Sequence, residues 1–203
     1  MTVVICPGVH SPELTTSFVQ QIGSQIDDYL IVPPDIALPY SAPHVFHYLH
    51  RQFVVPRPSA AQTALASVPL LFVSFSAGVV GAIGAAWMWQ ALGRTVKAFV
   101  AFDGWGVPLI GNFPIHRVSH DRFTHYSSIL WGGAAESFYA DPPVSHLDLW
   151  QSPQTAAGWR VSGSARLLTA EATSRTPATA ADFLLALLAK HHEVSSEKLT
   201  SNF

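Results

Sequence analysis

A serine flanked by small residues occupies the point where an apolar strand is expected to turn into a helix. The segment Ser74-Phe75-Ser76-Ala77-Gly78 separates the apolar run 70–73 from the Ala- and Gly-rich stretch 79–92. In a strand-turn-helix of this kind the central serine adopts a strained conformation that exposes its hydroxyl above the sheet. The start of the helix also directs backbone N–H groups at any oxyanion that forms nearby. We therefore predict that Ser76 is a nucleophile.

Candidates for a base and an acid follow this serine along the chain. Asp103 ends the next apolar run, and His146 lies in a Pro-rich loop beyond a possible later strand. A neutral imidazole accepts a serine proton, and a carboxylate orients the imidazole. We predict His146 as the general base and acid, and Asp103 as the residue that orients it. Other candidates stay open for these two roles: His125, His120 and Asp141.

Short apolar runs alternate with helical segments in the first half of the chain. Strands are expected at 3–6, 29–32, 70–75 and 96–102, and helices at 11–27, 44–53, 60–67 and 79–92. Fully apolar strands that alternate with helices form a parallel sheet with right-handed crossovers. The sequence thus predicts an α/β fold with a doubly wound, mostly parallel sheet and helices on both faces. Reactive groups gather at the carboxyl ends of the strands in such sheets.

The second half of the chain is less regular. The stretch 104–125 is rich in Gly, Pro and His without periodicity, so we predict a long functional loop there. A fifth strand is expected at 127–131 or at 137–140. The pair Thr176-Pro177 is expected to cap a last helix that runs to about His191.

These features together resemble the α/β-hydrolase superfamily, and in particular its compact, lidless esterase, lipase and thioesterase members. The small-x-Ser-x-Gly turn at Ser76 resembles the nucleophile elbow of that superfamily, and the order Ser76, Asp103, His146 matches its Ser, Asp, His order. The chain departs from the pattern in having Ser74 in place of the usual first glycine and Pro7-Gly8 in place of a common His-Gly. Asp103 also follows the strand next to the elbow strand, whereas most members place the acid one strand later.

The resemblance implies a site and a reaction. Ser76 would attack a carbonyl carbon, and the N–H of Ala77 together with that of Val9 or His10 would form the oxyanion hole. Apolar and aromatic residues dominate the segments that follow the strands, so an apolar acyl group in an ester or thioester is the expected substrate. The reaction would proceed through an acyl-enzyme without a cofactor. The expected pocket residues are Trp105, Phe113, Tyr126 and Phe138.

Two functions of other classes remain as alternatives. The spacing of His44, His47 and His50, or the cluster His116, His120 and His125, suggests a metal-dependent hydrolase. Three histidines at i, i+3 and i+6 spread over more than half of a helix circumference, and no His-Glu-x-x-His motif is present, so metal chemistry is disfavoured. A hydrolase-like fold can also lose its activity and act as a binding module.

Composition narrows the remaining possibilities. Of 203 residues, 49% are hydrophobic and 12% charged, and the net charge of −2 includes only 11 Lys and Arg, so we expect one folded domain (1–203) that binds no nucleic acid. Cys6 is the single cysteine, and the N-terminus lacks a signal-peptide pattern, so a cytoplasmic location is expected. Within the uncharged stretch 58–93, the apolar part 68–89 has the length of a membrane span, but its central turn predicts a buried strand and helix instead. The expected partner is a small acyl substrate, and the sequence makes no prediction of oligomeric state.

Overall fold

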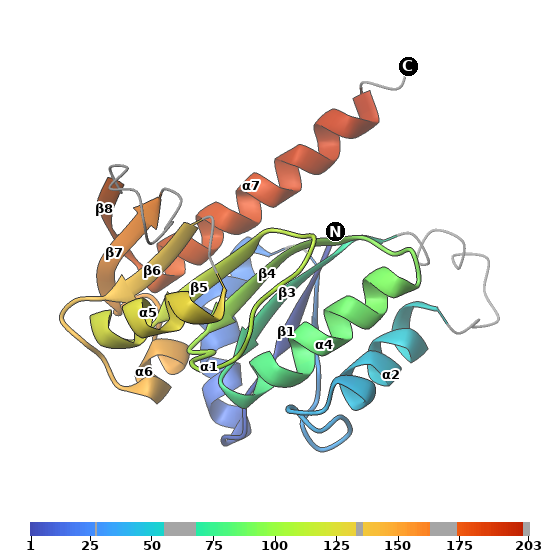
Figure 1. Cartoon of the computed structure of the whole chain (residues 1–203), viewed down its shortest axis with the longest axis horizontal. Coiled ribbons are helices and arrows are strands. Elements are labelled where there is room, and N and C mark those ends of the chain that lie inside the picture. The colour runs from blue at the N-terminus through green and yellow to red at the C-terminus, as the bar shows by residue number, and fades with distance from the viewer. Residues whose placement is uncertain (27, 55–67, 133–135, 163–173, 201–203) are drawn as a thin grey trace.

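An eight-stranded sheet forms the centre of the protein. The computed structural model describes residues 1–26, 28–54, 68–132, 136–162 and 174–200, without the side chains of 193–200. The strand order is β2-β1-β3-β4-β5-β6-β7-β8 (Figure 1). Strands β1 to β6 run parallel, and β7 and β8 are each antiparallel to the strand before them. Their bounds are β1 Thr2–Cys6, β2 Tyr29–Ile31, β3 Leu70–Phe75, β4 Val96–Phe102, β5 Ile115–Ser119, β6 Glu136–Ala140, β7 Ala157–Ser162 and β8 Ser174–Thr179.

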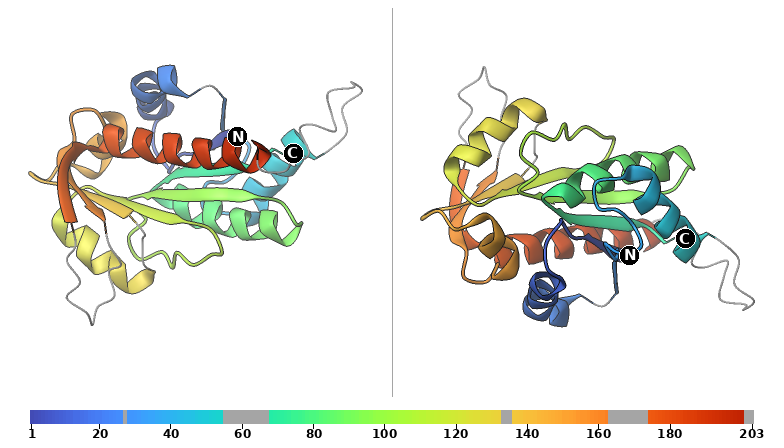
Figure 2. Two further views of the ribbon diagram at one scale, coloured as in Figure 1. Left: turned by 90° about the horizontal axis from the view of Figure 1, so that it is seen from above. Right: turned by 90° about the horizontal axis from the view of Figure 1, so that it is seen from below.

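Helices cover both faces of the sheet, as the sequence predicted (Figure 2). One face carries α1 (Pro12–Ile22), α6 (His146–Gln151) and α7 (Ala180–Thr200). The opposite face carries α2 (Ala42–Phe53), α4 (Ala77–Ala91) and α5 (Arg122–Ser128). Two short 3-10 helices, η1 (Gly23–Gln25) and η2 (Ile129–Trp131), follow α1 and α5.

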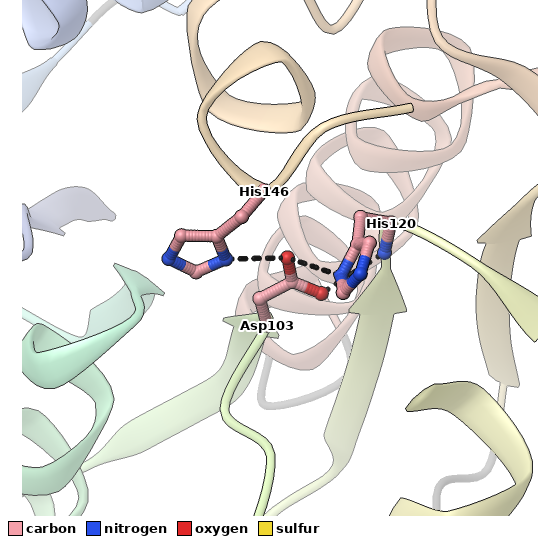
Figure 3. Close-up of side chains that lie close together, drawn as sticks. All are labelled: Asp103, His120 and His146. Atoms are coloured by element: carbon pink, nitrogen blue, oxygen red, sulfur yellow. Dashed lines mark hydrogen bonds and ion pairs between the residues drawn. The ribbon is translucent and has the colours of Figure 1, made fainter. Parts of the chain in front are cut away.

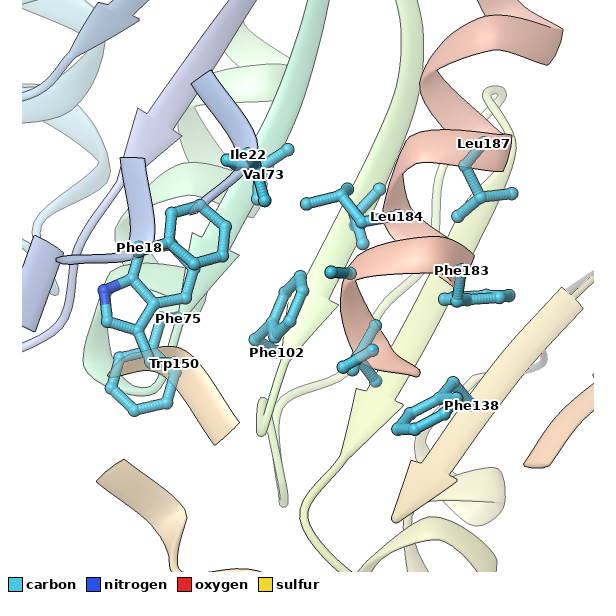
Figure 4. Packing of buried hydrophobic residues seen from close by; sticks show 14 of the residues in the cluster. Phe18, Ile22, Val73, Phe75, Phe102, Phe138, Trp150, Phe183, Leu184 and Leu187 are labelled. Atoms are coloured by element: carbon cyan, nitrogen blue, oxygen red, sulfur yellow. The ribbon is translucent and has the colours of Figure 1, made fainter. Parts of the chain in front are cut away.

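Each face of the sheet buries its own apolar cluster, because successive strand residues point to opposite faces. Val73 and Phe75 of β3 belong to the cluster beneath α1, α6 and α7, and Phe72 belongs to the cluster beneath α2 and α4. Figure 4 shows the first cluster, in which Phe75 lies beside Phe102 and Trp150. The aromatic side chains of this cluster reach the carboxyl ends of β3 and β4.

The described part of the uncharged stretch, 68–93, forms the predicted strand, turn and helix. β3 ends at Phe75, α4 begins at Ala77, and both elements are largely buried. Among the described residues, no helix is both long and apolar enough to cross a membrane.

Several predicted elements need correction. Segment 104–125 is not one loop, because it contains β5 and the start of α5. Of the two places where a fifth strand was expected, 127–131 is helical, and 137–140 lies in β6. Thr176-Pro177 lies in β8 rather than at a helix start, and β7 was not predicted. The first helix ends at Ile22 rather than near 27, and the helix expected at 60–67 lies outside the described residues.

These errors have physical causes. β5 (Ile-His-Arg-Val-Ser) buries a histidine and an arginine, so it lacks the apolar composition of a central strand. β8 pairs only with β7, and an edge strand tolerates a proline, since one side of its backbone needs no partner. The cap of α7 lies at Thr179, which exchanges hydrogen bonds with Asp182.

Candidate active site

Ser76 forms the turn between β3 and α4 in a strained backbone conformation. Its φ is 52° and its ψ is −124°, a region that costs a residue with a side chain about 1–3 kcal/mol. Hydrogen bonds hold the turn on both sides: Ser76 N–H donates to Phe102 O at 2.9 Å, and Val79 N–H donates to Ser76 O at 3.0 Å. Ser76 is half-buried and faces a pocket at the carboxyl end of the sheet.

Small residues allow the loop after β1 to pack against this turn. A Cβ atom on Gly78 would lie 2.4 Å from a backbone oxygen of that loop, and one on Gly8 would lie 3.0 Å from the Ser76 Cβ. Ser74 is buried, and its hydroxyl donates to Val100 O at 3.2 Å. Position 78 therefore requires glycine, whereas Ser74 fills a buried position in β3 and does not face the pocket lined by Ser76.

The residues predicted to form an oxyanion hole border the same turn. Ala77 is the first residue of α4 and lines the pocket beside Ser76. The first N–H groups of a helix have no acceptor within the helix and are oriented to donate to an anion. Val9 and His10 directly follow Gly8, which packs against Ser76. The Val9 side chain is exposed, and the His10 ring lies 5.5 Å from the ring of Phe75.

His146 connects Ser76 to Asp103 through both of its ring nitrogens. Its Nε2 lies 3.1 Å from Ser76 Oγ, and its Nδ1 lies 2.8 Å from Asp103 Oδ2. Asp103 directly follows β4 and has a φ of 48°, and His146 begins α6. A carboxylate only accepts hydrogen bonds, so Nδ1 carries the proton and Nε2 is left to accept the Ser76 proton. This chain of contacts is the one that general-base activation of a serine requires.

Asp103 is suited to hold a negative charge despite its burial. Its side chain is only 2% exposed. Burial raises the pKa of the carboxyl, but hydrogen bonds from His120 and His146 lower it by more, so the pKa lies below the ordinary value. Asp103 is therefore ionised at neutral pH and can stabilise an imidazolium on His146.

An aromatic stack supports the imidazole of His146. The ring of Phe75 lies between the His146 ring, at a centroid distance of 4.6 Å, and the Trp150 ring, at 5.1 Å. Trp150 is in turn stacked on Phe18 at 3.6 Å. This column connects the residue before Ser76 to α6 and α1, and it fixes the plane of the imidazole.

The other candidates for base and acid lie in different surroundings. His125 is buried, and the pKa of its ring is lowered to about 4, mainly by burial and then by nearby Arg117 and Arg175. Asp141 is exposed, and its Oδ2 accepts a hydrogen bond from Trp159 Nε1 at 3.1 Å. His120 contacts the acid: its Nδ1 lies 2.8 Å from Asp103 Oδ2 (Figure 3), whereas the imidazole nitrogen beside Ser76 Oγ is His146 Nε2.

The pocket at Ser76 has a volume of about 470 Å³, within the range of small-molecule sites. Of the four residues predicted to line it, only Trp105 does so. Phe113 lies in the cluster beneath α2 and α4, Phe138 is fully buried on the α7 face, and Tyr126 is an exposed residue whose hydroxyl accepts from Arg175. The described lining consists of Ser76, Ala77, Val80, Asp103, Trp105, Val107, His120, Thr124 and His146.

A buried arginine holds the pocket wall, and sequence reasoning missed it because β5 was not predicted. The guanidinium of Arg117 donates to the backbone oxygens of Gly104, Val107, Trp131 and Gly132 at 3.0–3.4 Å. Burial lowers its pKa to about 10. Arg117 therefore joins the segment that carries Trp105 and Val107 to the end of η2.

A metal ion would need several ligand atoms that lie close to one another. Within the described part of the chain, one group of His, Cys, Asp and Glu places three ligand atoms within 4.8 Å of one another: Asp103, His120 and His146. Both histidines already direct an Nδ1 at the Asp103 carboxylate, so these donor atoms satisfy one another. The histidine clusters suggested by the sequence form no such group in the described residues: His44, His47 and His50 lie along α2, and His116 instead contacts His191 at 3.2 Å.

Comparisons with known proteins do not assign a family. The sequence matches no known family and no curated protein. Function is therefore inferred from the strained turn at Ser76 and the side chains that contact it.

Proposed function

We propose that this protein is a serine hydrolase of the α/β-hydrolase type that cleaves an ester or thioester with an apolar acyl group. One observation carries the proposal: on a strained strand-to-helix turn, Ser76 Oγ lies 3.1 Å from His146 Nε2, and His146 Nδ1 lies 2.8 Å from Asp103 Oδ2. Ser76, Asp103 and His146 follow three parallel strands at their carboxyl ends, where reactive groups of doubly wound sheets gather.

The reaction follows from these contacts in two stages. Ser76 Oγ attacks the carbonyl carbon as His146 Nε2 takes its proton, and the resulting oxyanion accepts hydrogen bonds from backbone N–H groups at Ala77 and in the loop after β1. His146 then gives the proton to the departing alcohol or thiol, which leaves an acyl group on Ser76. A water molecule attacks this acyl group, His146 takes its proton, and Ser76 regains the proton as the acid is released.

The pocket lining supports an apolar acyl group. Val80, Trp105 and Val107 supply apolar surface beside Ser76, and Arg117 holds this wall through the backbone oxygens of Gly104 and Val107. Asp103 is the only formally acidic residue in the described lining, and it is already engaged by two histidines. A phosphate or sugar acid would find no lysine or arginine among these lining residues.

Covalent labelling tests the proposal most directly. A fluorophosphonate should add one adduct to the wild-type protein, and peptide mapping should place it on Ser76. Ser76→Ala should abolish labelling, whereas Ser74→Ala should retain it because Ser74 is buried and bonded to Val100 O. An unlabelled wild type, or an adduct on Ser74, would contradict the proposal.

Substrate class is tested with p-nitrophenyl esters and acyl-CoAs of graded length. Activity should require Ser76 and rise with acyl length until the pocket is filled. His146→Gln should remove nearly all turnover, and His125→Gln should not, since His125 is buried away from the described pocket lining.

The two alternatives predict different outcomes. A metal-dependent hydrolase using Asp103, His120 and His146 would lose activity on chelation and regain it with Zn²⁺, without needing Ser76. A binding module would fail to react with the fluorophosphonate although Ser76 is in place. We expect labelling that is insensitive to EDTA.

A further inference from the structure

The carboxylate of Asp103 is engaged by two residues, and His120 makes most of the contacts. His120 N–H donates to Asp103 Oδ1 at 2.9 Å, and His120 Nδ1 lies 2.8 Å from Asp103 Oδ2. The same Oδ2 receives the Nδ1 of His146, also at 2.8 Å (Figure 3). Both oxygens of the carboxylate are therefore held by His120. The imidazole of His146 donates to Oδ2, whose orientation the contacts with His120 already fix.

The position of His120 explains how it reaches two parts of the site. It follows β5 directly, and β5 lies next to β4, the strand that Asp103 directly follows. The His120 backbone oxygen accepts from Val144 N–H at 3.1 Å, in the segment that leads to His146. The backbone of His120 thus connects the segment that leads to His146 with the end of β5. The ring of His120 contacts the Asp103 carboxylate.

The ring of His120 is oriented from both of its nitrogens. Since Asp103 is an acceptor, His120 Nδ1 must carry a proton. His120 Nε2 lies 3.4 Å from Asp121 Oδ2, and the ring meets His146 edge-on at a centroid distance of 6.2 Å. The hydrogen bond to Asp103 raises the pKa of His120. Nδ1 of His120 therefore donates to Asp103 both when the imidazole is neutral and when it is protonated.

We propose that His120 is a positioning residue of the Ser76 site: its ring N–H holds the Asp103 carboxylate in the rotation that directs Oδ2 at His146. This role rests on the proposed hydrolase function, in which His146 must keep its Nε2 aimed at Ser76. Without the ring donor, one hydrogen bond from the His120 backbone remains at Oδ1, and the carboxylate can turn away from His146. Small misplacements of this kind are costly in catalysis.

Two variants of the same shape isolate the ring donor. In His120→Asn, the amide nitrogen takes the place of Nδ1 and keeps the donor, whereas His120→Leu has a similar branched outline without a donor. Both keep the backbone contacts with Asp103 and Val144. We expect His120→Leu to lower kcat by about 10–100-fold with KM within about twofold, since a supporting residue of this kind acts through the one it orients. His120→Asn should stay within about threefold of wild type.

A measurement independent of turnover separates this inference from the proposed function. In protein labelled with ¹⁵N-histidine, the Nδ1–H of His146 should give a downfield proton resonance because it is bonded to a carboxylate. His146→Gln assigns that resonance. It should persist in His120→Asn and broaden or vanish in His120→Leu, whether or not the protein hydrolyses any ester.

The outcomes are distinct. An unchanged His146 resonance in a folded His120→Leu variant overturns the positioning role, and so does an equal loss of kcat in the Asn and Leu variants. A resonance that behaves as expected in a protein that no fluorophosphonate labels overturns the hydrolase function alone. If His120→Leu does not fold, His120→Ala takes its place, with melting temperature as the check.

Discussion

The imidazole of His146 lies nearly parallel to the phenyl ring of Phe75, with ring centroids 4.6 Å apart and planes inclined by 26°. Phe75 immediately precedes Ser76, so one residue of β3 both leads into the strained turn and packs against the imidazole that contacts Ser76. Trp150 backs Phe75 on its other side at an inclination of 10°. Packing against Phe75 therefore orients the plane of the imidazole, and the hydrogen bond to Asp103 orients the ring within that plane.

Replacing Phe75 with leucine should lower kcat by about tenfold, because the imidazole loses a flat support but keeps Asp103. The matched control is Phe72→Leu, which removes a ring from β3 on the opposite face of the sheet. Both changes should lower the free energy of unfolding by about 1–2 kcal/mol. Steady-state kinetics and urea unfolding separate the two effects. Equal losses of kcat in both variants would mean that stability, and not the support of His146, explains the change.

Removing the charge of Asp103 should lower turnover far more than removing the charge of Asp141. Asp103→Asn should lower turnover on the order of 10³–10⁴-fold, since an amide neither holds the required tautomer nor stabilises the imidazolium. Asp141→Asn should stay within about tenfold of wild type, because Asp141 is exposed and contacts Trp159 instead of His146. The measurement is kcat/KM for both variants on one ester. The reverse order would assign the orienting role to Asp141.

The sequence was most informative where the strands are fully apolar. β3 and β4 are buried along nearly their whole length, so their ends, and hence Ser76 and Asp103, could be located from the sequence. Their closeness followed from the pairing of neighbouring parallel strands. His146 was located because a Pro-rich loop separates it from β6.

What the sequence did not reveal lies around β5. Its buried polar residues His116 and Arg117 are satisfied by backbone oxygens of segments that are distant in sequence. Such partners exist only once the chain is folded, so composition alone argued for a loop. Because β5 was missed, two contacts could not be predicted: that of His120 with Asp103, and the hydrogen bonds from Arg117 to the backbone of the pocket wall.

The strain at Ser76 should be measurable as stability. Ser76→Gly and Ser76→Ala both remove the hydroxyl, but glycine adopts a φ of 52° without penalty. We expect the glycine variant to be the more stable of the two by about 1 kcal/mol, since relief of about 1–3 kcal/mol of strain exceeds the added entropy of the unfolded chain. The control pair is Gln20→Gly and Gln20→Ala, at an exposed position of α1. There the alanine variant should be the more stable one, because alanine is the better helix former. Urea unfolding of the four variants tests both orders. A Ser76→Gly variant less stable than Ser76→Ala would show that the turn is unstrained.

Acid should destabilise the protein partly through His125. This ring is buried between Tyr126 and Tyr139, and its Nδ1 has no hydrogen-bond partner among the described residues. Burial is the main cause that lowers its pKa from 6.5 to about 4. Between these values the unfolded chain binds a proton that the folded protein does not, so the free energy of unfolding falls as the pH drops from 6.5 to about 4.

The variant that tests this is His125→Phe, which cannot take up a proton and fits an aromatic surrounding. Its stability at pH 7 should be close to that of wild type, and its loss between pH 7 and pH 4.5 should be smaller by about 2–3 kcal/mol. The matched control is His47→Gln, which changes an exposed histidine of α2 and should leave the acid loss unaltered. His116 has a pKa that burial likewise lowers to about 4, so part of the acid loss should remain in every variant. Urea unfolding at the two pH values gives the comparison, and an acid loss in His125→Phe as large as that of wild type would rule out this histidine as a source of acid sensitivity.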